Sequence, residues 1–179
     1  MIFLNPLFQI ASGWIYGHVM EYSIHRWLLH KIFKKRNTVF SFHFSQHHKD
    51  TRKNRFKDPA YLAPFNPKNA AGKELLSLLG LLILHTPIAL FAPWFFGATV
   101  FSIVSYYFQH YKAHTNRPWA KKHLSWHYDH HMGFDQDKNF GVRSAVFDKL
   151  FGTYKPFLNS HEYLRLMEIK QRFDRKKKK

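Results

Sequence analysis

The chain has 179 residues, a net charge of +17 and no cysteine. This length fits a single domain, residues 1–179, and the lack of cysteine excludes a disulfide framework, an iron–sulfur cluster and a thiolate zinc site. A basic, aromatic-rich chain can bind single-stranded nucleic acid, but here most aromatic residues lie in apolar segments, apart from the lysines. We therefore expect no nucleic-acid partner. The positive charge is better explained as a means of attracting the chain to anionic lipid headgroups.

The first segment, residues 2–24, is mostly apolar and has neither a basic start nor a small-residue cleavage site, which argues against a removable signal peptide. We expect one spanning or deeply embedded helix. Glu21 lies four residues before His25 and shares its helical face, so it is a candidate to orient that imidazole. The alternative is a surface carboxylate that pairs with Arg26 or Lys31.

Two later segments, residues 75–92 and 94–111, contain no charged residue. Each is just long enough to cross a hydrocarbon core of roughly 30 Å. With a tight turn at Pro93 and Trp94, they predict a helical hairpin through the membrane. The alternative is a pair of buried helices in a soluble protein, but so small a chain has little else to cover them. The expected fold is an all-α integral membrane protein with about three spans.

Basic residues concentrate in three places: residues 31–57, residues 112–122 and the tail 171–179. If the hairpin forms, all three lie on one side of the membrane, and the positive-inside rule makes that side cytoplasmic. Residues 25–74 and 112–179 are therefore expected to form a cytosolic helical cap, and the first helix to begin outside.

Ten of the fourteen histidines fall into four clusters with the patterns HxxxxH, HxxxHH, HxxxH and HxxHH. All four clusters are expected on the cytoplasmic side. The i, i+3 and i+4 spacing places the last cluster on one helical face, and His43 and His47 share a face for the same reason. A solvated basic loop would not produce so regular a pattern. The clustered residues are His25, His30, His43, His47, His48, His110, His114, His127, His130 and His131.

Imidazole is the commonest side-chain metal ligand, and ten imidazoles exceed the roughly four to six positions around one transition-metal ion. The pattern therefore predicts a site for two metals. Neutral nitrogen ligands suit iron, copper or zinc. Two irons at a lipid boundary favour activation of O2 and attack on an unactivated C–H bond of a chain in the bilayer. Soluble di-iron bundles use Glu and Glu-x-x-His ligands instead.

Four segments carry a family resemblance. They are EYSIHRWLLH (21–30), FSQHHK (44–49), HYKAH (110–114) and HYDHHMGFDQDKNFGVRSAVFDKLFGT (127–153). The sequence resembles the membrane fatty acid hydroxylase superfamily, which includes sterol desaturases, and is most similar to fatty acid 2-hydroxylases. The resemblance implies a few membrane helices capped by a cytosolic helical domain that holds a dimetal centre, with the ten clustered histidines as ligands. One departure is the second cluster, HxxxHH, where those enzymes usually have HxxHH.

The resemblance also implies an O2-dependent hydroxylase with two iron ions, for which zinc can substitute in purified protein. Because the chain has no room for a fused cytochrome b5 domain, we expect an external electron donor of the cytochrome b5 or ferredoxin type. The NFG…FGT ending favours a fatty-acyl or sphingoid substrate. The alternatives are a carotenoid hydroxylase, a sterol oxidase or desaturase, an ether-lipid monooxygenase, or a non-catalytic membrane metal-binding protein.

Several residues are candidates to hydrogen-bond the ligand histidines without binding a metal themselves. Asn139 belongs to the loop that matches the family, and its alternative is a simple turn residue. Asp129, Asp135 and Asp137 lie between or just after the last histidines. His85, in the middle of a span, is expected to make only a local polar contact. The Phe-rich spans either line an acyl tunnel or face the bilayer.

Overall fold

The structure, a computed structural model, describes residues 5–35 and 38–177. Throughout these ranges every regular element is a helix and none is a strand, as an all-α fold requires. Residues 2–4 of the first expected span lie outside the described residues. The long helices are α1 (Pro6–Ser23), α3 (Ala70–His85), α4 (Pro93–Thr115) and α8 (His161–Lys177).

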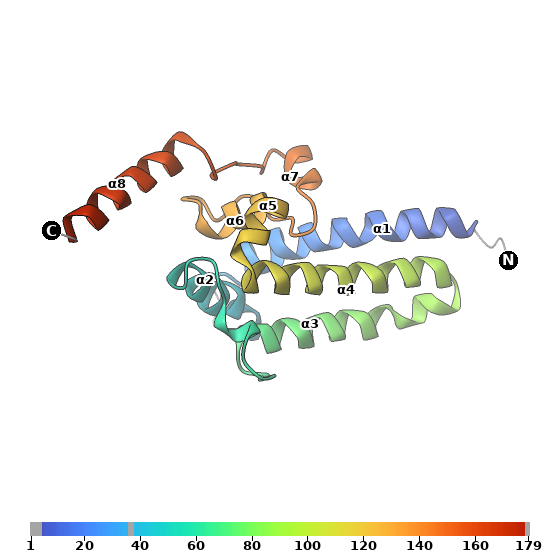
Figure 1. Ribbon diagram of the computed structural model, residues 1–179. Helices are drawn as coiled ribbons and strands as arrows, with labels where there is room; N and C mark the ends of the chain where they lie inside the picture. The colour runs from blue at the N-terminus through green and yellow to red at the C-terminus, as the bar shows by residue number, and fades with distance from the viewer. Residues whose placement is uncertain (1–4, 36–37, 178–179) are drawn as a thin grey trace.

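Helices α1, α3 and α4 lie side by side as an elongated layer, with the start of α1 and the α3–α4 turn at the same end (Figure 1). Glycines allow α1 and α4 to approach closely. A Cβ atom at Gly13 would lie 2.7 Å from the Phe95 carbonyl oxygen, and one at Gly17 would lie 2.3 Å from Ser102 Oγ. Any side chain at either glycine would force the two helices apart.

The α3–α4 hairpin differs from the expected one at its turn. Helix α3 ends at His85 and continues as one 3₁₀ turn, η5 (Thr86–Leu90), because Pro87 cannot donate the next helical hydrogen bond. Pro93 does not lie in the turn but begins α4, where its missing N–H costs nothing. The chain therefore reverses before Pro93.

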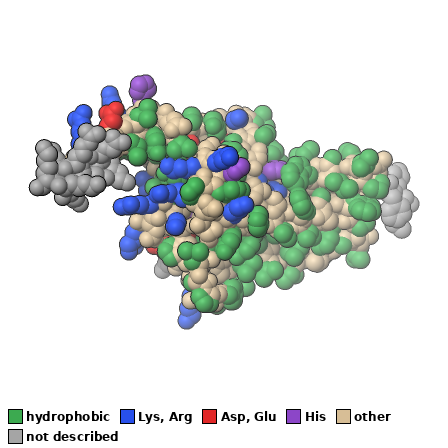
Figure 2. All heavy atoms as spheres, in the orientation of Figure 1, with side chains coloured by type: hydrophobic (Ala, Val, Ile, Leu, Met, Phe, Trp, Pro, Cys, Tyr) green, Lys and Arg blue, Asp and Glu red, His purple; other side chains and the backbone are tan. Residues whose placement is uncertain are grey.

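The surface of the helical layer is apolar. Ala70–Leu90 is the one helix, over the ranges that the structure covers, that is long and apolar enough to cross a membrane by length and composition. Large apolar side chains are also exposed on α1 and α4, among them Leu7, Ile15, Phe101 and Phe108. In Figure 2 hydrophobic side chains cover this layer, whereas lysines and arginines gather over the cap at the opposite end.

The cap consists of short helices at the far end of the layer from the hairpin turn (Figure 1). Its apolar core is small and contains Phe56, Ala113, Ala120, Leu124 and Tyr128. Phe56 is fully buried in a left-handed backbone conformation, φ 78°, which reverses the chain after α2. The cap elements are η1 (Ile24–Ile32), η2 (Val39–Ser41), η3 (His43–His48), α2 (Lys49–Lys53), η4 (Pro59–Tyr61), α5 (Arg117–His123), α6 (Ser125–Met132) and α7 (Val146–Leu150).

Candidate metal centre

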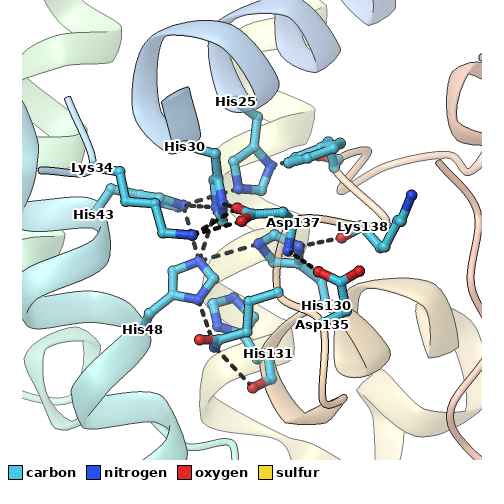
Figure 3. Close-up of polar contacts among 12 residues, drawn as sticks. His25, His30, Lys34, His43, His48, His130, His131, Asp135, Asp137 and Lys138 are labelled. Atoms are coloured by element: carbon cyan, nitrogen blue, oxygen red, sulfur yellow. Dashed lines mark hydrogen bonds and ion pairs between the residues drawn. The ribbon is translucent and has the colours of Figure 1, made fainter. Parts of the chain in front are cut away.

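The ten clustered histidines meet where the helical layer joins the cap, and all of them are buried. Nine form two groups, and within each group one ring nitrogen per residue lies within 4.8 Å of all the others. His127 adjoins the second group, with its Nε2 3.0 Å from His114 Nε2. The first group is His25, His30, His43, His48 and His130, and the second is His47, His110, His114 and His131. Figure 3 shows the imidazoles of the first group pointing toward one another.

Two π-helices explain how histidines five residues apart share a group. In an α-helix such residues point roughly 140° apart, whereas the i→i+5 hydrogen bonds of a π-helix bring them onto one face. In η1 the rings of His25 and His30 lie 4.9 Å apart, and in η3 those of His43 and His48 lie 4.8 Å apart. The expectation that His43 and His47 share a face holds for an α-helix, whereas in the π-helix η3 His47 points to the other group.

Carboxylates that come from distant parts of the chain orient three of the imidazoles. His30 Nδ1 lies 3.0 Å from Asp137, His47 Nδ1 lies 2.7 Å from Asp58, and His110 Nδ1 lies 2.6 Å from Glu74. Each contact favours a proton on Nδ1 and leaves the Nε2 lone pair directed into its group.

Backbone carbonyl groups orient three further imidazoles in the same way. His25 Nδ1 donates to the Phe140 oxygen at 2.5 Å, His114 Nδ1 to the Phe56 oxygen at 3.2 Å, and His130 Nδ1 to the Lys138 oxygen at 2.6 Å. Six imidazoles therefore present Nε2 lone pairs inward.

The nitrogen geometry fits metal ions. Inward Nε2 atoms of the first group lie 2.9 to 3.3 Å apart. Two nitrogens about 2.0–2.1 Å from one ion, at angles of roughly 90–109°, would be separated by about 2.8–3.4 Å. His110 and His114 both donate their Nδ1 protons outward, so their Nε2 lone pairs face each other 3.2 Å apart. A bound cation would turn this repulsion into attraction.

Buried ring nitrogens without hydrogen-bond partners also support metal binding. Within the described part of the chain, His47 Nε2 and both ring nitrogens of His131 are buried without a hydrogen-bond partner. A buried polar atom without a partner is costly unless something binds it. Each group can therefore hold a metal ion.

Burial keeps the imidazoles in the ligand form. Desolvation lowers the pKa values of His43, His48, His130 and His131 well below the ordinary value, and neighbouring histidines lower them further. A lowered pKa means that these rings are neutral near pH 7, and neutral imidazole is the form that binds metals.

Three of the five residues expected to orient the ligand histidines, Glu21, Asp129 and Asn139, have side chains that bind other partners. Glu21 accepts from the Val142 and Arg143 backbone N–H groups and pairs with the Arg143 guanidinium, and so does not orient His25. Asp129 accepts from the backbone N–H groups of Phe157 and Leu158.

Asn139 has φ 57°, and its side chain bonds both the N–H and the carbonyl of Lys155. It is therefore a turn residue that ties two loops together. The actual carboxylate partners include Asp137, which the sequence suggested, and Asp58 and Glu74, which it did not. Glu74 carries one signal in the sequence, since it is the sole acidic residue between Asp58 and Asp129.

A cavity of about 710 Å³ connects this centre to the helical layer. His25 and His43 of the first group and His47 and His110 of the second line it, so both groups are accessible from one space. The remaining wall is mostly apolar and comes largely from α1, α3 and α4. The fold and the site together define a helical protein with two adjacent groups of histidines that line an apolar cavity.

Comparisons with known proteins agree with this class. The family model described as fatty acid hydroxylase matches residues 10–153, and the chain belongs to that family. It is 33% identical to the dihydroceramide fatty acyl 2-hydroxylase FAH2 of Arabidopsis thaliana over 150 residues, which are 80% of this chain and 59% of the plant protein. It is 37% identical over 68 residues to the dihydroceramide fatty acyl 2-hydroxylase FAH1 of the same plant, covering 38% of this chain and 27% of that protein. No solved structure matches the chain.

Proposed function

We propose that the protein is an O2-dependent hydroxylase of a membrane lipid, acting on a C–H bond of a fatty-acyl or sphingoid chain. The observation that carries the proposal is that histidines of both groups line one and the same apolar cavity. A hydrocarbon chain in this space can reach the paired centre without crossing a polar surface. The two plant relatives are named as fatty acyl 2-hydroxylases, which favours an acyl chain over a carotenoid or a sterol.

The ten histidines are the proposed ligands of two iron ions, with zinc as the alternative in purified protein. When bound, iron would supply the chemistry that activates O2 with electrons from an external donor. The chain's own contribution is positional. Asp58, Glu74 and Asp137 hold protons on Nδ1 of their histidines, and the apolar wall holds the lipid and excludes water from the reacting carbon.

The proposed membrane arrangement has three spans in one domain: residues 2–24, 75–92 and 94–111. The exposed apolar side chains of α1, α3 and α4 support it. The basic cap, residues 25–74 and 112–179, would then lie on the cytoplasmic side with the centre, where a separate redox partner of the cytochrome b5 or ferredoxin type can reach it.

Expression in a bacterium without such an activity tests the proposal. Lipids from cells with the natural protein and with the double variant His130→Ala/His131→Ala are compared by mass spectrometry, with a redox partner coexpressed. We expect new lipids heavier by one oxygen, ~16 Da, in cells with the natural protein and none in cells with the double variant. Tandem mass spectrometry then locates the hydroxyl on the acyl or the sphingoid chain.

If no new lipids appear, metal analysis of the same two proteins distinguishes the possible reasons. About two ions per chain without new lipids would point to a missing substrate or donor. Near-zero metal in the natural protein would overturn the proposal and favour a non-catalytic membrane protein.

A further inference from the structure

The cavity has a defined inner end. Along the three helices of the layer, the lining residue farthest from the histidines is Tyr16 in α1, His85 in α3 and Thr99 in α4. Tyr16 and His85 close the space between α1 and α3, because the Tyr16 hydroxyl lies 2.7 Å from His85 Nε2. The Tyr16 ring also contacts the Phe95 ring, with 5.2 Å between their centroids.

The closing pair is held rigidly. His85 Nδ1 donates to the Leu81 carbonyl oxygen at 2.6 Å, which leaves Nε2 to accept the Tyr16 hydroxyl proton. His85 is buried, so breaking this hydrogen bond would leave polar atoms unpaired in apolar surroundings. The pair therefore resists being pushed aside by a hydrocarbon chain.

The depth of the cavity follows from helix geometry. Glu74, which contacts His110 of the centre, and His85 are eleven residues apart in α3, and this corresponds to about 16 Å. Tyr16 and His25 are nine residues apart, which corresponds to about 14 Å along an ideal helix. Both lengths are close to half of a roughly 30 Å hydrocarbon core, the span of the acyl chains of one leaflet.

We propose that the hydrogen-bonded pair Tyr16–His85 is the floor of an acyl-chain site and sets the longest chain that the protein accepts. This inference rests on the proposed function, since it assumes that a lipid chain enters the cavity from the histidine end. The end of the chain meets a polar, fixed barrier, and longer chains cannot extend past it.

A glycine on the cavity wall offers the sharpest test. Gly80 lines the cavity six residues beyond Glu74, and a Cβ atom there would have no atom within 4 Å. Gly80→Leu thus adds bulk at the cavity wall without a backbone clash. Gly97 in α4 has the same open surroundings but lines a separate surface groove with Trp14 and Phe101, so Gly97→Leu is the matched control.

The experiment measures lipid binding, so its result does not depend on whether the protein hydroxylates the lipid. The natural protein and its variants are purified in detergent, and their thermal stabilisation is measured with N-acyl sphinganines of increasing saturated chain length. We expect the best-stabilising length to be shorter for Gly80→Leu, longer for Tyr16→Ala, and unchanged for Gly97→Leu.

Equal length profiles in Gly80→Leu and Gly97→Leu, or an absence of stabilisation by every length, would overturn the inference. A shifted profile in a protein that never hydroxylates these lipids would retain the chain site and overturn the proposed reaction. The melting temperature of each variant without lipid reports its folding stability. This value is subtracted from the melting temperatures that the same variant gives with lipid.

Discussion

His47 and His48 are consecutive in the chain, yet their imidazoles belong to different groups of the centre. Their ring planes are nearly perpendicular, at 88°. The His47 ring faces His114 and His131, with centroids 4.5 and 4.7 Å away. The His48 ring lies 4.8 and 4.7 Å from His43 and His130, and 4.3 Å from His131 of the other group. His130 and His131 divide in the same way, with rings at 83°. Each doublet is therefore a bridge between the two centres.

This division predicts separate metal losses. His48→Ala removes a ligand of the first group and His47→Ala a ligand of the second, so each variant should lose about one ion per chain and keep the other. Elemental analysis of the purified proteins measures this. His161→Ala, at an exposed position in α8, is the control and should keep both ions. Identical loss of all metal from both single variants would argue that the centre binds its ions only as a pair.

The buried carboxylate Asp58 should matter more to metal affinity than the exposed Asp137. Asp58 is 1% exposed and bonds His47 Nδ1, so Asp58→Asn should lower the affinity for metal by roughly 10–100-fold. The Asp137 side chain is 54% exposed, and water can replace it beside His30, so Asp137→Asn should lower affinity less. Competition with a graded series of chelators measures both. Equal effects would show that solvent does not substitute for Asp137.

The ion pair of Glu21 and Arg143 should contribute to stability. Their side chains are only 5% and 2% exposed, and Glu21 also accepts two backbone hydrogen bonds. Glu21→Ala leaves a buried guanidinium without its partner and should cost about 3–5 kcal/mol. Thermal unfolding in detergent measures the loss. The double variant Glu21→Leu/Arg143→Met should recover part of it, since no buried charge remains; a double variant as unstable as Glu21→Ala would assign the loss to the backbone hydrogen bonds.

Asn139 should act through its backbone conformation and its side chain together. Asn139→Gly keeps the left-handed φ of 57° and loses the two hydrogen bonds to Lys155, a loss of roughly 1–3 kcal/mol. Asn139→Ala loses the same bonds and adds about 1 kcal/mol of backbone strain. Unfolding measurements on both variants should therefore give Asn139→Ala a lower free energy of unfolding than Asn139→Gly. The reverse order would mean that the turn relaxes to another conformation.

Much of the centre could be predicted from the sequence, because histidine spacing is a local signal. All ten clustered histidines are buried at one place, and the family is confirmed. The helical hairpin also forms, since its two apolar runs are long and free of charge. Its turn was misplaced by a few residues, because Pro93 suits both a turn and the first position of a helix.

The sequence could not reveal how the histidines divide between the two groups. His25 and His30 would point apart in an α-helix, and nothing in their local sequence announces a π-helix. Asp58 and His47 are eleven residues apart, and Glu74 and His110 are farther still. Such pairs depend on how whole helices pack, which residue spacing does not report. Asp129 and Asn139 are plausible candidates because they lie close to the clustered histidines in the sequence, but their side chains bind the backbone of residues 155–158 instead.

The order in which a ribosome makes the chain adds a constraint on assembly. The first group needs His130 and the second needs His131, and both come from α6, which is synthesised after α1, α3 and α4. The three long helices therefore emerge before either group is complete. Neither group can therefore have its full set of histidines until α6, which supplies one histidine to each, has been made.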